Sequence, residues 1–113
     1  MKIAVTSQNF KSITGHAGKT RRFLIYTQNE QGEWQESERL DLSKEMSMHE
    51  FRGEKHPIEV VDVLITAGCG HGFVSRMQTL GIQVVATSEA DPLSAVTQYA
   101  SGETLAAPAP HKH

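Results

Sequence analysis

The fold is decided by one stretch of the chain, which reads Val60-Val61-Asp62-Val63-Leu64-Ile65-Thr66-Ala67-Gly68-Cys69-Gly70-His71-Gly72-Phe73. Its first part, Val60 to Ile65, is apolar and rich in β-branched residues, which is typical of a buried parallel strand. Apolar side chains then recur at helical spacing from Phe73 to Leu80, and Gly81 ends the predicted helix. The glycine-rich turn between the two elements should therefore lie at the carboxyl end of a strand.

The residues that follow predict a second strand and a second helix, at 82–86 and 92–100. Asp91 is suited to the N-cap of this helix, Pro92 to its first turn and Gly102 to its end. The expected apolar stripe of the helix consists of Leu93, Val96 and Tyr99. Because a strand, a helix and a strand follow in order, a right-handed crossover makes the two strands parallel.

The first half of the chain predicts antiparallel strands. A strand at Met1 to Thr6 is followed by a long polar loop over 7–19, and Phe23 to Tyr26 pairs as a hairpin with Trp34 to Leu42. The segment from Ser43 to Pro57 permits a short helix opened by Ser43, before Gly53 and a turn at Lys55-His56-Pro57. We expect an α/β fold, a mixed sheet of about five strands with helices on both faces.

Composition limits the classes of function. The 113 residues suit one domain, expected over 1–105, followed by a proline-rich disordered tail over 106–113 that ends in His111-Lys112-His113. The net charge of −2 provides no overall basic field for nucleic acid or an acidic membrane. The one cysteine excludes an internal disulfide and a four-thiolate cluster site built from one chain. No apolar run approaches membrane-spanning length, so we expect a soluble cytoplasmic protein.

The best candidate site is the turn that contains Cys69 and His71. Strand ends and helix N-termini of α/β sheets commonly bind ligands and favour anions. A thiol near a helix N-terminus is expected to have a lowered pKa, which favours a nucleophilic or metal-binding thiolate. The neighbouring glycines, Gly68, Gly70 and Gly72, let a ligand approach the backbone closely. The alternative is a cysteine that only packs as a small apolar residue under a tight turn.

A second candidate is His16, in the loop that follows the first strand and so reaches the same sheet edge. The loop ends in three basic residues, Lys19, Arg21 and Arg22. Together they would form a positively charged opening that favours anions. The alternatives are an exposed loop histidine and solvated surface charge. A Cys/His enzyme would need His71 or His16 as base and an orienting third group, which the sequence does not identify. No carboxylate pair, P-loop or dinucleotide fingerprint is present.

The order of several segments makes the chain similar to a known family. These segments are Met1 to Thr6, Gly15 to Lys19, Phe23 to Tyr26, Asp62 to Thr66 with its glycine turn, Gly81 to Val84, Ala95-Val96 and Gly102. Together they resemble the dinitrogenase iron-molybdenum cofactor biosynthesis family, small domains of the NifX and NafY type that also occur at the C-terminus of NifB. The resemblance covers nearly the whole chain.

The resemblance implies a ribonuclease H-like fold without its carboxylate site, and proteins that bind or carry iron-sulfur-based cofactors without turning over a substrate. The family has a His-Phe-Gly-Arg-like loop, and His16 matches the histidine of this loop. The resemblance therefore implies that His16 contacts a cluster. Ala17 stands where the family usually has an aromatic residue, and Lys19 where arginine is common. Lys19 keeps the positive charge but lacks the guanidinium fork.

The leading hypothesis is therefore a non-enzymatic carrier or accessory protein in nitrogen fixation, with an iron-sulfur or iron-molybdenum-sulfur cluster as transient cargo. The expected metal ligands are Cys69, His71 and His16, and the other expected cofactor-binding residues are Lys19, Gly68, Gly70 and Gly72. The expected partner is a protein that donates or accepts the cluster, and the chain is expected to be a monomer or a weak homodimer. The alternative is a regulatory or protein-interaction domain of the same fold without a bound cluster.

Overall fold

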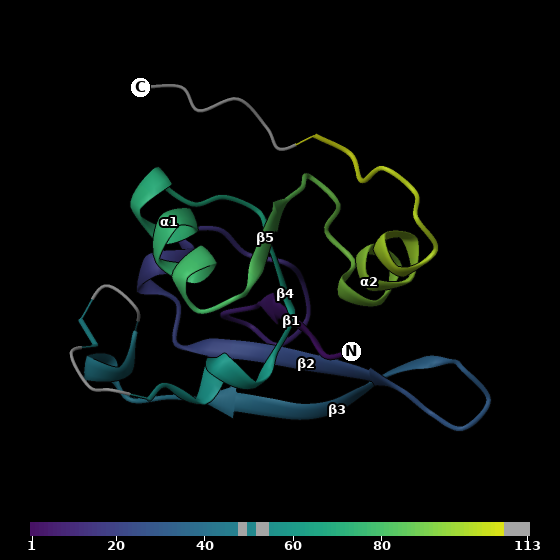
Figure 1. Ribbon diagram of the computed structural model, residues 1–113, viewed down its shortest axis with the longest axis horizontal. Coiled ribbons are helices and arrows are strands. Elements are labelled where there is room, and N and C mark those ends of the chain that lie inside the picture. Colours follow the sequence, from purple (N-terminus) through teal and green to yellow (C-terminus); the bar gives the residue numbers. More distant parts are fainter. Residues whose placement is uncertain (48–49, 52–54, 108–113) are drawn as a thin grey trace.

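The computed structural model describes residues 1–47, 50–51 and 55–107 (Figure 1). The regular elements in this part of the chain are strands, two α-helices and short 3₁₀ helices. The strands are β1 (Ile3–Thr6), β2 (Arg22–Gln28), β3 (Trp34–Asp41), β4 (Val63–Thr66) and β5 (Gln83–Ala86). The helices are α1 (His71–Thr79) and α2 (Pro92–Ala100), with 3₁₀ helices η1 (Ala17–Lys19), η2 (Lys44–Met46) and η3 (Pro57–Val60).

The five strands form one mixed sheet with the order β3-β2-β1-β4-β5. β2 pairs antiparallel with β1 and β3, whereas β4 pairs parallel with β1 and β5. The antiparallel part follows from the short β2–β3 connection, and the parallel part from the crossover through α1. The expected α/β fold with a five-stranded mixed sheet is confirmed. Its ribonuclease H-like label remains a prediction from the resemblance.

Side chains alternate between two cores, one on each face of the sheet. In β1, Ala4 packs in the core on the α1 side, while Ile3 and Val5 pack in the core on the α2 side. Phe73 and Met77 of α1 enter the first core, and Ala95 and Val96 of α2 enter the second. Figure 1 shows the two helices on opposite sides of β4 and β5, so helices cover both faces, as expected.

Local signals placed the two helices with small errors. α2 has the predicted bounds, and the Asp91 carboxylate accepts a 2.8 Å hydrogen bond from the Ser94 N–H. α1 begins at His71 instead of Phe73, since the Gly70 carbonyl already accepts from Val74. The expected stripe of α2 was wrong at one residue: Leu93 is 44% exposed, and Ala95 lies in the core instead.

The predicted strand at 60–65 also needs a correction. Val60 belongs to η3 and is 56% exposed, and β4 begins only at Val63. Pro57 opens η3, so the apolar run is shared between a 3₁₀ turn and a strand. Asp62, between them, is exposed and accepts a 2.9 Å hydrogen bond from the Lys2 N–H.

The segment after β3 contains the single turn η2, with Ser43 at its N-cap as expected. Gly53 and His49 of this segment lie outside the described residues. At the other end of the chain, the Ala106 carbonyl accepts hydrogen bonds from the Thr87 hydroxyl and the Ser88 N–H. Residues 108–113 are not described, so the predicted disorder of the tail stays a prediction. None of the helices in the described parts combines the length and the hydropathy of a membrane-spanning segment.

His56 joins η2 to η3 through a buried imidazole. Its Nδ1 accepts from the Ile58 N–H at 3.0 Å, and its Nε2 contacts the Met46 carbonyl, to which a neutral ring donates. The ring also meets Phe51 edge-on, with centroids 4.9 Å apart. Burial lowers the pKa of His56, and the nearby Arg76 acts in the same direction, whereas the Met46 carbonyl and Glu59 oppose the shift.

We therefore expect His56 to make stability depend on pH. Because its pKa is lowered in the folded state, the unfolded chain takes up a proton first as the pH falls below about 6.5, the ordinary histidine value. Its contribution is complete above that pH and is lost as the pH falls through the folded pKa. Urea unfolding at several pH values between 5 and 8 checks this: His56→Gln should flatten the slope of unfolding free energy against pH. An unchanged slope would contradict it.

Candidate functional site

The carboxyl ends of β1 and β4 are joined by two threonine hydroxyls. Thr6 and Thr66 are both fully buried, and their Oγ1 atoms are 2.8 Å apart. Thr6 Oγ1 lies 2.6 Å from the Thr14 carbonyl, and Thr66 Oγ1 lies 3.2 Å from the same carbonyl and from that of Gly68. One buried pair therefore binds the loop after β1 and the turn after β4.

Backbone hydrogen bonds then bring the His16 loop and the Cys69 turn together. The Ala67 N–H donates to the Thr14 carbonyl at 3.1 Å, and the Ala17 N–H donates to the Gly68 carbonyl at 3.2 Å. A Cβ at Gly15 would lie 3.6 Å from the Gly68 nitrogen, so the two backbones pass in close contact. His16 and Cys69 each stand next to a residue of this contact. The expected neighbourhood of the two loops is present.

His16 and Lys19 project from this contact into solvent. His16 has φ 53° and ψ 49°, a left-handed conformation uncommon for a non-glycine residue, and makes no capping hydrogen bond with its side chain. Both side chains are exposed, while Ala17 between them is fully buried. The loop therefore anchors itself through Ala17 and leaves the imidazole and the ammonium available to a ligand.

Cys69 is half-buried and packs against the core on the α1 side. Burial raises the pKa of its thiol, which corrects the lowered pKa that the helix N-terminus led us to expect. The cause is burial, because placing a thiolate against apolar side chains is unfavourable. A raised pKa is the opposite of what an activated cysteine nucleophile needs, so this finding weighs against a Cys/His enzyme.

The rest of the turn is open. Gly70, His71 and Gly72 are exposed, and a Cβ at Gly70 or Gly72 would meet nothing within 4 Å. Gly70 has φ −90°, which any residue can adopt. Neither packing nor backbone conformation therefore requires glycine at these two positions. Free space at a helix N-terminus is what a ligand contacting the backbone would use.

The protein donors do not form a ready metal centre. Within the described residues, no group of three or more His, Cys, Asp or Glu side chains is placed so that it could hold a metal ion. Cys69, His71 and His16 offer one half-buried sulfur and two exposed imidazoles on adjoining segments. This donor set suits a cargo that brings its own bridging atoms better than it suits a bare ion.

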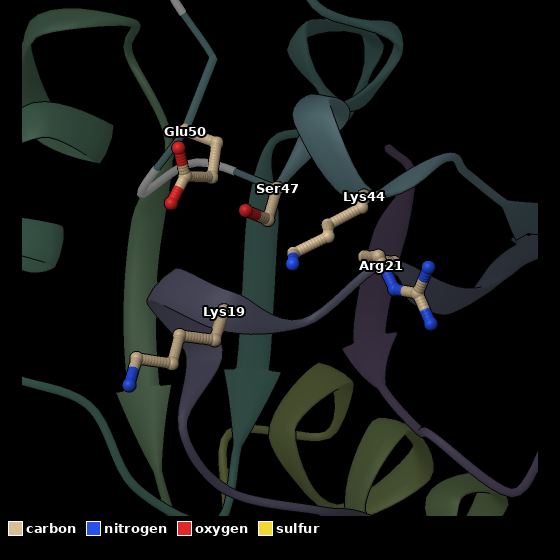
Figure 2. A pocket seen from close by; sticks show the side chains of 5 residues that line it. All are labelled: Lys19, Arg21, Lys44, Ser47 and Glu50. Atoms are coloured by element: carbon tan, nitrogen blue, oxygen red, sulfur yellow. The ribbon is translucent and has the colours of Figure 1, made fainter.

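Next to the His16 loop is a cavity that the sequence did not predict as a unit. It has a volume of about 430 Å³ and is lined by Lys19, Arg21, Lys44, Ser47 and Glu50 (Figure 2). The predicted basic group is only partly correct, because Arg22 instead pairs with Asp41 at 3.2 Å. Lys44 was missed because it lies 25 residues beyond Lys19, and no motif links the two.

The fold and the site define a small α/β domain that presents a histidine loop and a cysteine turn side by side at the carboxyl edge of a mixed sheet. A family model described as dinitrogenase iron-molybdenum cofactor matches residues 1–102. The chain belongs to this family, which relates it to that cofactor and agrees with an accessory or carrier role. No curated protein sequence matches the chain.

Two solved structures share the fold. The crystal structure of PH0822 has a TM-score of 0.68 and 16% identity, with 91% of this chain and 93% of that chain covered. The NMR structure of a Thermotoga protein, described as NifB-like and as belonging to the DUF35 family, has a TM-score of 0.61 and 14% identity. Here 99% of this chain and 97% of that chain are covered. At these identities the likeness concerns the fold alone.

The threonine pair should be energetically coupled. Thr66→Val keeps the shape but removes a buried hydroxyl, which should lower the free energy of unfolding by about 1–3 kcal/mol. Thr6→Val should behave alike, and the double variant should lose less than the sum, by at least about 0.5 kcal/mol. Urea unfolding of all four proteins measures the coupling.

Thr27→Val is the matched control, because Thr27 occupies a half-buried position in β2. Its effect should stay within about 0.5 kcal/mol. Strict additivity of the Thr6 and Thr66 substitutions would show that the pair does not act as one unit.

Proposed function

We propose that this protein is a non-enzymatic carrier or accessory protein for an iron-sulfur-based metal cluster of the iron-molybdenum cofactor or precursor type. The cluster is its cargo, taken from one protein and passed to another in cofactor biosynthesis. Cys69, His71 and His16 supply the metal ligands. Lys19 and the backbone at Gly68, Gly70 and Gly72 contact the anionic surface of the cluster.

The contact between the His16 loop and the Cys69 turn is the observation that carries the proposal. The Ala17–Gly68 hydrogen bond places residues adjacent to two proposed ligands in one backbone contact, although they lie more than fifty positions apart in the chain. The exposed positions beside them leave a face on which a bulky cargo can rest. Few protein bonds and an open face suit a carrier, because the cargo must also leave.

The environment of Cys69 also fits one alternative function. Its contact with the α1 core and its raised pKa also fit a cysteine that only packs under the turn. In that case the same surface serves a regulatory or protein-interaction domain without a cluster. The two functions differ in whether Cys69 affects metal retention.

Metal loading tests the proposal directly. The protein is incubated anaerobically with iron, sulfide and molybdate, or with a preassembled cluster, then desalted and analysed for metal, sulfide and absorption. Wild type should retain both metal and sulfide, and Cys69→Ala, His71→Ala and His16→Ala should each reduce retention several-fold because each removes a ligand. All proteins should be made without residues 108–113, since His111 and His113 could bind metal by themselves.

Gly70→Ala and Lys11→Ala complete the design. Gly70→Ala should leave unfolding unchanged, because a Cβ there meets nothing within 4 Å, yet reduce retention if the cluster rests on the turn. Lys19→Ala should reduce retention because Lys19 is proposed to contact the cluster, whereas Lys11→Ala removes the same charge from another exposed loop and should have no effect. Equal retention in every variant, or none in wild type with either source of cluster, would reject the carrier and favour the interaction domain.

Loading should also depend on pH. Binding of a metal to Cys69 displaces the thiol proton, and the raised pKa makes this displacement harder at low pH. Retention by wild type should therefore rise as the pH is raised from about 6.5 to 8.5, toward the thiol pKa. Metal content after desalting at each pH measures the rise, and Cys69→Ala should flatten it. A flat wild-type profile would remove Cys69 from the ligand set.

A further inference from the structure

The cavity beside the His16 loop lies between η1, the start of β2 and the segment that follows β3. Lys19 and Arg21 contribute one wall, and Lys44, Ser47 and Glu50 the other (Figure 2). The Leu42 N–H donates to the Arg21 carbonyl at 2.9 Å, which holds the two walls together at one end. Apart from Lys19, none of the described residues that line the cavity belongs to the proposed cluster site.

The charges around this cavity are unbalanced. Among the described residues that line it, Lys19, Arg21 and Lys44 are cationic and Glu50 is acidic. Among the described residues, ion pairs form at Arg22–Asp41 and Arg39–Glu36, and none involves Lys19, Arg21 or Lys44. Cationic groups around a cavity favour an anion inside it.

Ser47 adds a buried hydrogen-bonding group to the wall. The residue is only 4% exposed overall and lines the cavity. Figure 2 shows this hydroxyl on the same side as the Lys44 ammonium. A ligand oxygen in the cavity could therefore accept from both an ammonium and a hydroxyl.

Hydrogen bonds hold the wall around Ser47 in place. Its carbonyl accepts from the N–H groups of Glu50 at 3.0 Å and Phe51 at 2.7 Å. Arg76 of α1 donates to the Phe51 carbonyl at 3.0 Å, and His56 contacts the Met46 carbonyl on the other side. These bonds connect the described residues of the wall to α1 and η3.

We propose that this cavity binds a small organic anion that carries two or three negative charges on carboxylate or phosphate groups. Lys44, Arg21 and Lys19 bind the charged groups, and the Ser47 hydroxyl donates to one of their oxygens. The volume lies in the range of about 300–1,000 Å³ that small-molecule sites occupy, which exceeds the needs of a single inorganic ion. This site goes beyond the proposed cluster site and does not depend on it.

Calorimetric titration of the full-length, metal-free protein at low ionic strength tests the proposal. Citrate represents polycarboxylates, fructose 1,6-bisphosphate represents phosphate esters, and acetate is the monovalent control. We expect saturable one-to-one binding of at least one multivalent anion and none of acetate. The anion that binds more tightly, citrate or fructose 1,6-bisphosphate, identifies whether the ligand is a polycarboxylate or a phosphate ester.

Substitutions locate the binding. Lys44→Ala and Arg21→Ala should each weaken it about tenfold, because each removes a charge-assisted hydrogen bond. Ser47→Ala should weaken it less, and Glu50→Gln should strengthen it by removing a repelling carboxylate. Lys11→Ala changes the net charge equally and should alter affinity less than twofold. The exposed positions of Lys44, Arg21 and Glu50 should leave the melting temperature unchanged.

Absence of saturable binding by both multivalent anions would overturn the proposal, and so would equal losses in Lys11→Ala and Lys44→Ala. The two sites can fail separately. Cys69→Ala and His71→Ala should bind the anion as wild type does, and Lys44→Ala should retain as much metal as wild type. Loss of cluster loading with anion binding intact would reject only the carrier.

Discussion

The hydrogen bond between the Thr6 and Thr66 hydroxyls is the constraint on which the functional edge of this protein depends. Both groups are fully buried, where an unpaired hydroxyl is costly. One hydroxyl proton forms the bond between them and the Thr6 hydroxyl lies 2.6 Å from the Thr14 carbonyl, while the Gly68 N–H donates to Thr66 Oγ1 at 3.4 Å. The pair thereby turns two neighbouring strand ends into one surface, and the positions of His16 and Cys69 follow from it.

That surface and the adjacent cavity differ in chemistry, and we propose a different ligand for each. The Cys69 turn offers a soft sulfur, imidazoles and open backbone, while the cavity offers hard cationic groups and a hydroxyl. Lys19 stands between them, since it follows His16 in the loop and lines the cavity. Under our two proposals, one set of groups holds a metal-sulfur cargo and the other an organic anion. Membership of the dinitrogenase iron-molybdenum cofactor family agrees with the first proposal.

Sequence reasoning succeeded where the signal was local. Asp91-Pro92 placed the start of α2 because an N-cap and a first-turn proline act on their own helix. Sequence reasoning failed where contacts between distant parts of the chain decide whether a residue is buried or exposed. Val60 is apolar and β-branched like the strand residues that follow it. In the structure it belongs to η3, which leaves its side chain exposed to solvent. Leu93 has the spacing of a core residue, yet the way α2 rests on the sheet selects Ala95.

By itself, the sequence determined the order of elements, the mixed sheet and the two loops that contain His16 and Cys69, because hydrophobic periodicity and turn residues act over short distances. Tertiary structure alone decided the electrostatics and the second site. The thiol pKa of Cys69 rises because α1 packing buries it, an effect no local pattern reports. The cavity brings Lys19 and Lys44 together from distant segments. Charge and burial depend on distances in space, which a linear pattern does not contain.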